Sequence, residues 1–494
     1  MSKSVNEVYN GHNGHSKKPL IPYRYFIMTM ITIATVIVFF TRSIINVAIL
    51  AMVESGEKQN NATVQMRSKS NFNWDQRDQG YILGAYYYTY TAIQIGAGSL
   101  TDKFNAVHVF AGAQVIATIC TLITPIAAKM GMYYLIGVRM VLGLIHGTTF
   151  PTMYILIAKW FLPGEVGLAL GLMAAGSDVG SAIVMSVTAW ISTLGLWGGW
   201  PAAFYLVGLC NLIFLLAWIF TVTVEPQTNK FVSEYEKNQL ASITTGKSTK
   251  KVLKKKSTPW IKFLTSLPLW SVIIARGFMG LAYSLIYSKI PVYLASVLGY
   301  DIKHNGAINA MFYIAASVSQ ITIAPLAGHI VNKGWLRITL TRKIFETIAF
   351  CGIIINLIGV CYLENHHAII FCLVMSMFFY GFHFGGDASI IPEMAPAFIG
   401  TTYGFANTLG CAAGFITPVF VGTILGNDAS SQHKWAIIFQ ITIGLQVVSM
   451  ILFNLFATAE PLSWADYDED DEQQPQSVET ISENVQRKLS IIAY

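Results

Sequence analysis

Two arginines stand inside long apolar segments of this 494-residue chain, Arg42 in the first such segment and Arg139 in the fourth. A cation in the interior of a membrane costs several kcal/mol unless it faces a partner, a ligand or a water-filled cavity. The guanidinium group also presents a planar fork that matches carboxylate and phosphate oxygens. Two such groups, on different helices around one cavity, would bind a small anion. The alternative for each arginine is a structural pair with a buried carboxylate or with carbonyl groups at a helix end.

Further ionisable residues in the apolar segments are Asp178, Arg276, Lys289, His383 and Asp387. We predict that Arg276 and Lys289, the latter two residues before Pro291, line the same cavity and contribute to substrate binding. The alternative for Arg276 is that its long side chain reaches the cytoplasmic interface. Asp387 follows His383 by four residues, so a structural hydrogen bond on one helix face is expected between them.

His146 follows Arg139 by seven residues, about two helical turns, so both side chains lie on the same face of one helix. Histidine changes charge in mildly acidic solution. We therefore predict a proton-coupling role for His146, in which a protonated imidazole adds a positive charge near the anion and strengthens its binding at low pH. The alternative is a neutral histidine that is hydrogen-bonded to a neighbouring helix.

The segments that carry these residues are membrane-spanning helices by composition. The chain is 54% hydrophobic and 12% charged, whereas soluble domains carry about 25% charged residues. A bilayer core about 30 Å thick requires about 20 apolar residues per helix. Such runs predict an all-α polytopic membrane protein with twelve transmembrane helices, near residues 25–53, 79–100, 106–128, 133–157, 167–192, 200–223, 269–298, 306–331, 343–362, 367–391, 400–424 and 436–458.

Loop charge predicts the orientation. Loops rich in lysine and arginine are cytoplasmic, and the connection after the sixth segment holds Lys247, Lys250, Lys251, Lys254, Lys255 and Lys256. We therefore expect both termini on the cytoplasmic side. The loop at about 54–77 then faces outward, where Asn61-Ala62-Thr63 fits a glycosylation acceptor. The predicted organisation is a cytoplasmic tail (1–22), a six-helix bundle (23–223), a basic cytoplasmic linker (224–268), a second six-helix bundle (269–459) and an acidic cytoplasmic tail (460–494).

A short sequence repeats between the two bundles. Residues 98–103, Gly-Ser-Leu-Thr-Asp-Lys, follow the second helix, and residues 328–333, Gly-His-Ile-Val-Asn-Lys, follow the eighth. Repetition at a shift near 230 residues indicates two copies of one architecture, as in transporters built from parallel repeats. We predict a gating role for Asp102, Lys103 and Asn332 in these matched turns.

Other kinds of site are disfavoured. All six cysteines fall inside predicted helices, where a thiol behaves as a small hydrophobe, so neither a disulfide framework nor a metal site is expected. Gly246-Lys247-Ser248 fits a loose phosphate-loop pattern but lacks the strand and glycine-rich turn that nucleotide binding needs. We expect no cofactor, no nucleotide, no nucleic acid partner and no enzymatic activity. The expected surroundings are a lipid bilayer, with the chain as a monomer.

Several motifs occur in an order that resembles a known family. They are Arg42 with Val47-Ala48; Phe72-x-Trp74-Asp75-x-x-x-Gln79-Gly80-x-Ile82-Leu83-Gly84; Tyr90-x-x-x-Gln94-Ile95-x-x-Gly98; Arg139-x-x-x-Gly143-x-x-x-Gly147-x-Thr149-Phe150-Pro151; Lys159-Trp160; Glu393-x-Ala395-Pro396; Asn407; Pro418; and Trp464-Ala465. Together with the turn at 98–103, they resemble the major facilitator superfamily, and within it the anion and phosphate symporters that include sialin, the vesicular glutamate transporters and the inorganic phosphate cotransporters. The resemblance covers about residues 24–466.

This resemblance implies a secondary transporter of small organic anions, such as sialate, glutamate or urate-like acids, or of inorganic phosphate. It implies alternating access, coupling to H⁺ or Na⁺, and a plasma, endolysosomal or vesicular membrane. The chain departs from the family pattern at Leu142 and His146, where sialin-like members carry acidic residues, and at Leu83, where glutamate-transporting members carry histidine. At Met279 the family often has an arginine. The alternative function is a transporter-like, substrate-sensing receptor without concentrative transport.

Overall fold

A computed structural model describes residues 21–53, 72–74, 76–194, 199–245, 259–300, 302–426 and 428–465. Asn61, the lysines at 247–256 and residues 466–494 of the predicted acidic tail lie outside these ranges. The regular secondary structure of the described part is all helical, and eleven of its spans are long and apolar enough to cross a membrane. The second predicted span is present as a twelfth long helix of 28 residues, whose glutamines, threonines and glycines lower its apolar content. The predicted fold class is confirmed.

The first half of the chain contributes seven helical segments. They are α2 (Tyr23–Val53), α3 (Gln76–Lys103), α4 (Ala106–Met130), α5 (Met132–His146), α6 (Thr149–Trp160), α7 (Pro163–Leu194) and α8 (Trp200–Thr221). The connection to the second half contains η3 (Pro226–Thr228), α9 (Glu234–Thr245) and α10 (Trp260–Thr265). We call α2–α8 the N half.

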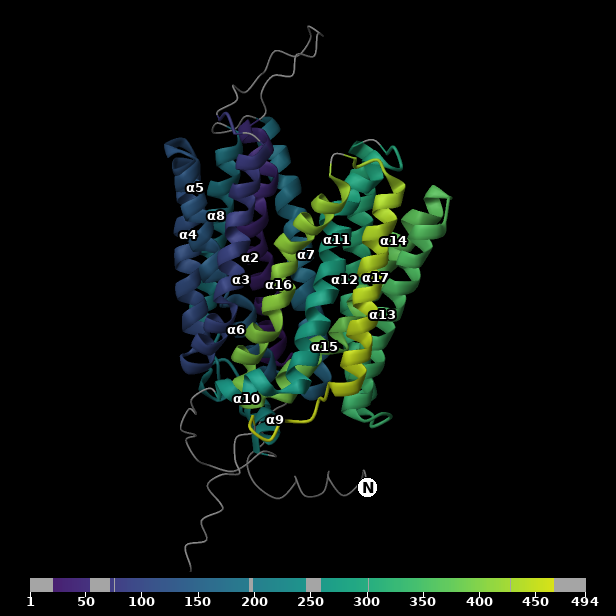
Figure 1. The fold of residues 1–494 in the computed structure, drawn as a ribbon. Helices are drawn as coiled ribbons and strands as arrows, with labels where there is room; N and C mark the ends of the chain where they lie inside the picture. The colour runs from purple at the N-terminus through teal and green to yellow at the C-terminus, as the bar shows by residue number, and fades with distance from the viewer. Residues whose placement is uncertain are drawn as a thin grey trace, which may run out of the picture.

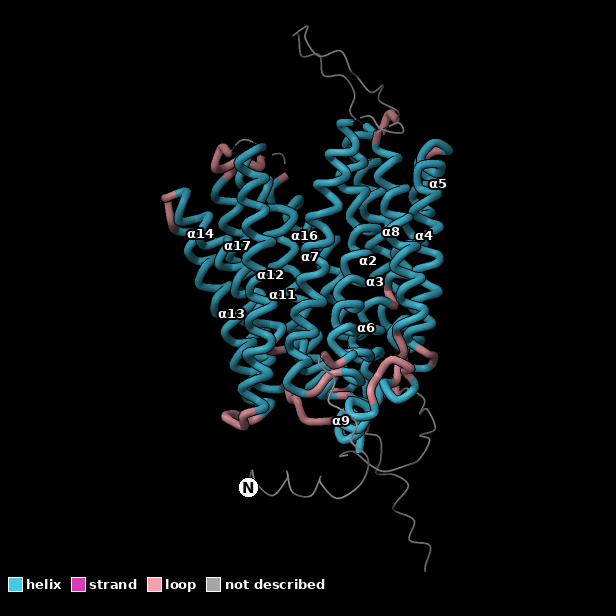
Figure 2. Tube along the Cα trace, turned by 180° about the vertical axis from the view of Figure 1, so that it is seen from behind, coloured by secondary structure: helices cyan, strands magenta, loops and turns pink. Residues whose placement is uncertain are grey.

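The second half, called the C half below, repeats this plan. Its elements are α11 (Leu267–Ser296), α12 (Ile302–Asn332), α13 (Ile338–Tyr362), α14 (His366–Tyr380), η4 (Gly381–Phe384), α15 (Asp387–Met394), η5 (Pro396–Phe398), α16 (Ile399–Leu425) and α17 (Gln432–Phe456). Figure 1 shows the halves side by side, with α9 and α10 at one end of the molecule. We call this end the linker end. The reversed view in Figure 2 shows the same two groups of helices, with most loops gathered at the two ends.

The halves meet through two matched helix pairs. In one, α16 packs against α3 of the other half, and in the second, α7 packs against α12. Both contacts depend on glycine, because a Cβ added at Gly404 would lie 2.2 Å from the carbonyl oxygen of Gln94, and one at Gly167 would lie 2.1 Å from that of Ala324. Small residues allow this close approach of helix backbones.

The fourth and tenth spans are both interrupted. The fourth breaks between α5 and α6 at Gly147-Thr148, and the tenth breaks between α14 and α15 at the 3-10 turn η4. Each interruption carries a buried histidine, His146 in the N half and His383 in the C half. Backbone that leaves the helical pattern inside a membrane is tolerated where protein surrounds it or a cavity lies beside it.

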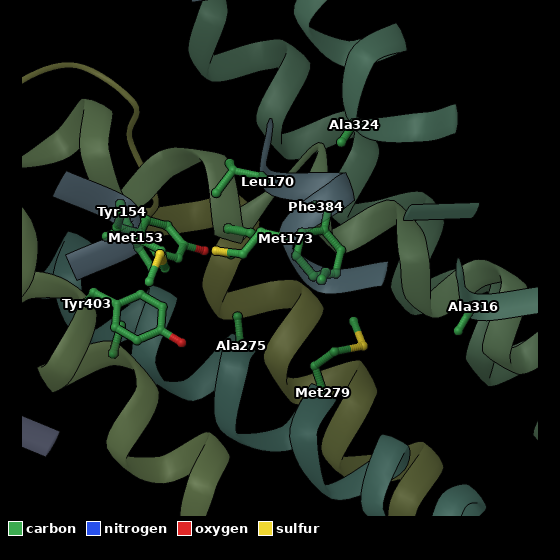
Figure 3. Packing of buried hydrophobic residues seen from close by; sticks show 14 of the residues in the cluster. Met153, Tyr154, Leu170, Met173, Ala275, Met279, Ala316, Ala324, Phe384 and Tyr403 are labelled. Carbon is green, nitrogen blue, oxygen red and sulfur yellow. The ribbon is translucent and has the colours of Figure 1, made fainter. Parts of the chain in front are cut away.

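Side chains from both halves fill the interface near these breaks. Figure 3 shows Met153 and Tyr154 of α6 close to Tyr403 of α16, with Met279 of α11 in the same buried cluster. Met279, at the position where the family often has an arginine, is 2% exposed. This part of the interface is an apolar, aromatic layer.

The linker is anchored to the N half. Glu236 of α9 accepts hydrogen bonds from the backbone N–H groups of Tyr23 and Arg24 at 2.8 and 2.9 Å, which caps the start of α2. The Arg24 side chain in turn pairs with Glu165 of α7 at 2.9 Å. A carboxylate at a helix N-terminus satisfies unpaired N–H groups and complements the helix dipole, so α9 is held firmly on α2.

Candidate functional site

Arg42 of α2 lies among aromatic rings. Its guanidinium carbon is 4.8 Å from the ring centroid of Phe39, 4.9 Å from that of Tyr87, 5.4 Å from that of Tyr86 and 5.6 Å from that of Tyr90. Aromatic faces attract a cation through their quadrupole. These rings stabilise the guanidinium, but they carry no charge to neutralise it.

Arg139 of α5 lies beside Arg42. It is 3% exposed, and its guanidinium carbon is 5.1 Å from the centroid of Tyr86. Its Nη1 donates to the carbonyl oxygen of Arg42 at 3.4 Å, and its Nε has no hydrogen-bond partner. Among the described residues, no carboxylate lies within 4.0 Å of either guanidinium. The alternative that each arginine pairs with a buried carboxylate is therefore not supported among the described residues.

His146 completes the cluster. Its Nδ1 is 3.1 Å from the hydroxyl of Tyr86, and its Nε2 is 3.4 Å from Oγ1 of Thr41. Tyr86 thus contacts all three predicted residues. Sequence reasoning did not single it out, although Tyr86, Tyr87, Tyr88 and Tyr90 form an unusual run within one helix. We call Arg42, Arg139, His146 and the surrounding tyrosines the N-half cluster.

The C half holds a different cluster. Nε of Arg276 lies 3.0 Å from Oδ2 of Asp387, and Oδ1 of Asp387 lies 2.7 Å from Nδ1 of His383. The structure therefore contains the expected contact between His383 and Asp387 and extends it to Arg276. Arg276 is 8% exposed, so it is held inside the bundle by this ion pair and does not reach the interface with water.

A second carboxylate adjoins this ion pair. Glu346 of α13 is 0% exposed, and its Oε2 accepts the backbone N–H of Asp387 at 2.9 Å. Its Oε1 has no hydrogen-bond partner in the described part of the chain. Sequence reasoning missed Glu346, although a single carboxylate inside an apolar segment was a usable signal. We call Arg276, His383, Asp387 and Glu346 the C-half cluster.

Tyr403 connects the C-half cluster to the other half. The guanidinium carbon of Arg276 lies 5.4 Å from its ring centroid. On the N-half side, the ring of Tyr154 is 4.4 Å from that of Tyr403, and both rings are visible in Figure 3. The charged group therefore borders the interface between the halves.

Lys289 joins neither cluster through any contact recorded among the described residues. It is half-buried and follows Arg276 by thirteen residues on α11. Thirteen residues are about 3.6 helical turns, so the two side chains leave the helix on roughly opposite sides. Its role in substrate binding stays a prediction.

The repeated turns contact the opposite half at the linker end. Asp102 accepts hydrogen bonds from the backbone N–H groups of Gly400 and Thr401 at 2.9 and 2.6 Å, at the start of α16. Asn332 packs on Gly164 at the start of α7, where an added Cβ would lie 1.6 Å from its Nδ2. Lys103 is the last residue of α3. Each turn thus closes on the first turn of a helix from the other half.

Asp178 makes a third contact between the halves. Its Oδ1 lies 3.4 Å from the hydroxyl of Tyr283, and its Oδ2 lies 3.4 Å from Nε2 of Gln320. Both donors belong to the C half and both are neutral. In the described ranges, no set of three or more histidine, cysteine, aspartate or glutamate side chains could hold a metal ion.

Comparison with known proteins agrees with this architecture. The chain is 28% identical to human sialin over 80% of this chain and 78% of that protein. It is 25% identical to a putative inorganic phosphate cotransporter of Drosophila melanogaster over 96% of this chain and 93% of that one. These relatives confirm the resemblance to the anion and phosphate symporters, which are membrane transporters and not enzymes.

The fold is also that of solved transporters. The structure of the transporter FucP in the outward conformation superposes with a TM-score of 0.61 at 11% identity, covering 86% of this chain and 99% of that one. The family model described as Major Facilitator Superfamily matches residues 31–418. The twelve-helix arrangement, the paired turns at the linker end and this match lead to one conclusion. The chain belongs to the major facilitator superfamily of membrane transporters.

Proposed function

We propose that this protein is a secondary carrier of a small anion, which binds to Arg42 and Arg139 of the N-half cluster. The observation that carries the proposal is the charge of that cluster. Two guanidinium groups from different helices lie together inside the bundle, with no carboxylate within 4.0 Å of them among the described residues. Arg139 is buried and Arg42 is half-buried; cations held inside a membrane protein without counter-charges are costly, and a bound anion would supply the missing negative charge.

The substrate class in this proposal is a small organic anion or inorganic phosphate. Relatives named sialin and putative inorganic phosphate cotransporter support both. The aromatic rings around Arg42 favour the organic anion, because Phe39 and Tyr87 offer apolar ring faces to the body of a carboxylate ligand. A guanidinium fork binds the head group of either one.

Transport in this proposal proceeds by alternating access of a site between the two halves. The linker end is cytoplasmic, as the lysine-rich connection predicts. The contacts of Asp102 and Asn332 then close the cytoplasmic side, and Asp102, Lys103 and Asn332 act as gate residues. The contacts that close the linker end favour an outward-open state. The membrane is the plasma membrane or that of an endolysosomal or vesicular compartment.

Coupling to H⁺ or Na⁺ is part of the proposal. His146 is the candidate proton carrier of the N half. Its Nδ1 contacts the hydroxyl of Tyr86, and the ring of the same tyrosine lies against the guanidinium groups of Arg42 and Arg139. A proton on its imidazole would add positive charge beside the anion. Burial and the two neighbouring guanidinium groups oppose this proton, so in this proposal it is taken up together with the anion, and anion binding strengthens as the pH falls.

Uptake by purified protein in proteoliposomes tests this function. Radiolabelled phosphate, N-acetylneuraminate and glutamate are supplied with and without imposed pH and Na⁺ gradients. The carrier proposal expects concentrative uptake of at least one anion, lost in Arg42→Ala. Binding of an anion without concentrative uptake under any gradient would instead support a substrate-sensing receptor.

A further inference from the structure

The C-half cluster contains four ionisable side chains that lie outside the proposed anion site at Arg42 and Arg139. Arg276, His383, Asp387 and Glu346 are each at most 8% exposed. They come from four different elements, α11, η4, α15 and α13. A group of this kind inside a membrane is costly to assemble, and ionisable residues in such positions mark ion and proton pathways.

The charges of this cluster do not balance when every acid and base is in its usual form. Arg276 carries one positive charge, and Asp387 neutralises it at 3.0 Å. Glu346 adds a second carboxylate, with no lysine or arginine nitrogen within 4.0 Å among the described residues. One proton taken up by the cluster removes this excess negative charge. Since Glu346 binds the N–H of Asp387 and Asp387 binds His383, the three titrate as a unit.

The neighbouring polar groups do not supply the missing charge. Arg342 lies one turn before Glu346 on α13, but its Nε donates to Glu393 at 3.0 Å and its Nη1 donates to the carbonyl oxygen of Gly385 at 3.1 Å. Lys343 points to the carbonyl oxygen of Asn454 on α17, at 2.7 Å. Both cations are therefore committed elsewhere.

The remaining groups that face the cluster are tyrosines and one distant acid. Tyr380 of α14 lies 4.6 Å from the ring of His383, measured between centroids. Tyr403 of α16 lies beneath Arg276, and Tyr154 of α6 lies against Tyr403. Asp178 of α7 is bound to Tyr283 and Gln320. None of these groups supplies a positive charge to the cluster.

We propose that the C-half cluster is a proton-binding site, additional to His146, in which Glu346, Asp387 and His383 share one exchangeable proton. We also propose that this proton is the one coupled to transport. This second statement rests on the proposed carrier function, whereas the proton site itself does not. Losing the proton leaves an uncompensated buried charge, which disfavours the conformation that keeps the cluster dry. The proton is therefore held while the cluster is closed, and is released when movement of α11 and α16 admits water.

The cluster is placed to act on the interface between the halves. Arg276 contacts Tyr403, whose helix α16 begins at the residues bound by Asp102 of the N half. A change in the charge of the cluster therefore acts on α16, a helix that packs against α3 of the N half. This geometry provides a physical route from proton binding to the movement of the two halves.

Infrared spectroscopy tests the proton site without any anion. The purified protein in lipid is titrated between mildly acidic and mildly basic pH, and the carbonyl stretch of protonated carboxylic acids is recorded. We expect a band in the wild type that Glu346→Gln removes, since glutamine keeps the acceptor for the N–H of Asp387. Glu364→Gln, an exposed carboxylate just beyond the same helix, should keep that band. An unchanged band in Glu346→Gln would overturn the proposal.

Transport measurements test the coupling. Proteoliposomes are assayed with phosphate and N-acetylneuraminate, both for exchange of internal against external anion and for net uptake driven by a pH gradient. Glu346→Gln should keep exchange and lose gradient-driven uptake by at least about tenfold. Equal retention of both activities would refute the coupling role and leave the carrier function intact. If the wild type moves neither anion, the carrier proposal fails, and the infrared result still decides the proton site.

A second variant protects this test against a folding failure of Glu346→Gln. His383→Gln removes the titratable imidazole while an amide can still donate to Asp387. The proposal expects a shifted infrared titration in this variant, because one member of the shared proton site is gone. A titration identical to that of the wild type would exclude His383 from the site.

Discussion

The two halves repeat one fold but differ in the charge they hold at corresponding places. Each has an interrupted span with a buried histidine beside it. Around the first, the N half places two guanidinium groups and, among the described residues, no carboxylate within 4.0 Å of them. Around the second, the C half places one guanidinium and two carboxylates. A duplicated scaffold can thus separate two tasks, because the cluster of the N half lacks negative charge and the cluster of the C half has it in excess.

Breaking the ion pair of the C half should have the largest effect. Asp387→Asn removes the carboxylate that lies 3.0 Å from the guanidinium of Arg276, and removing one partner of a buried pair costs about 3–5 kcal/mol. We expect a lower thermal unfolding temperature and reduced yield of folded protein, both partly restored in the double variant Arg276→Gln/Asp387→Asn. Asp178→Asn is the matched control, because its partners are neutral, and it should change stability little. Equal destabilisation by both single variants would contradict the assignment of charges.

The matching change in the N half should leave the fold intact and remove transport. Arg42→Ala deletes charge-assisted hydrogen bonds to the anion worth about 3 kcal/mol, or roughly a hundredfold in uptake. Arg42→Lys should recover only part of the activity, since an ammonium keeps the charge but loses the planar fork. Uptake into proteoliposomes at matched protein amounts measures this. Normal transport by Arg42→Ala would make the cation structural and remove the contrast between the halves.

The gate contacts should give a smaller effect. Asp102→Asn retains an acceptor for the N–H groups of α16 but loses the charge at its N-terminus, which is worth about 1 kcal/mol. The population closed at the linker end should fall roughly fivefold, with a changed transport rate and little change in substrate affinity. Cysteine accessibility at the linker end reports the population. An unaltered rate and accessibility in correctly inserted protein would argue against gating.

His146 should give the smallest change, and that change separates the two proton sites. His146→Gln keeps hydrogen bonding but cannot titrate. If His146 of the wild type binds a proton near the anion, anion uptake by the wild type should rise at mildly acidic pH by a few-fold, and uptake by the variant should not. Uptake against pH in both proteins measures this. Identical profiles would exclude His146 from coupling and leave the C-half cluster as the proposed proton site.

The sequence predicts the parts of this molecule that depend on local pattern. Apolar runs of sufficient length predict the twelve helices, and the repeated turn predicts the two halves. The spacing of Arg139 and His146 places them on one face, and the structure brings them together with Arg42. The four-residue spacing of His383 and Asp387 likewise matches their contact.

What the sequence does not predict depends on contacts between distant segments. Tyr86 is one tyrosine among several until its neighbours α2 and α5 are known. Glu346 gains significance only because its helix meets Asp387, 41 residues later. Arg276 lies inside the bundle and not at the cytoplasmic surface of the membrane because it pairs with that same aspartate. The breaks at Gly147 and Gly381 lie inside apolar segments that the sequence analysis predicts as single spans, 133–157 and 367–391.

The anchoring of α9 has a practical consequence for following this protein in motion. Because Glu236 caps α2 and Arg24 joins α2 to α7, the short helix must travel with the N half as part of one rigid body. Glu234 at its start has a 71% exposed side chain, and Lys333 is exposed at the corresponding end of the C half. A pair of spectroscopic labels at these two positions would therefore act as a ruler for the opening of the linker end, outside the lipid and away from both charged clusters.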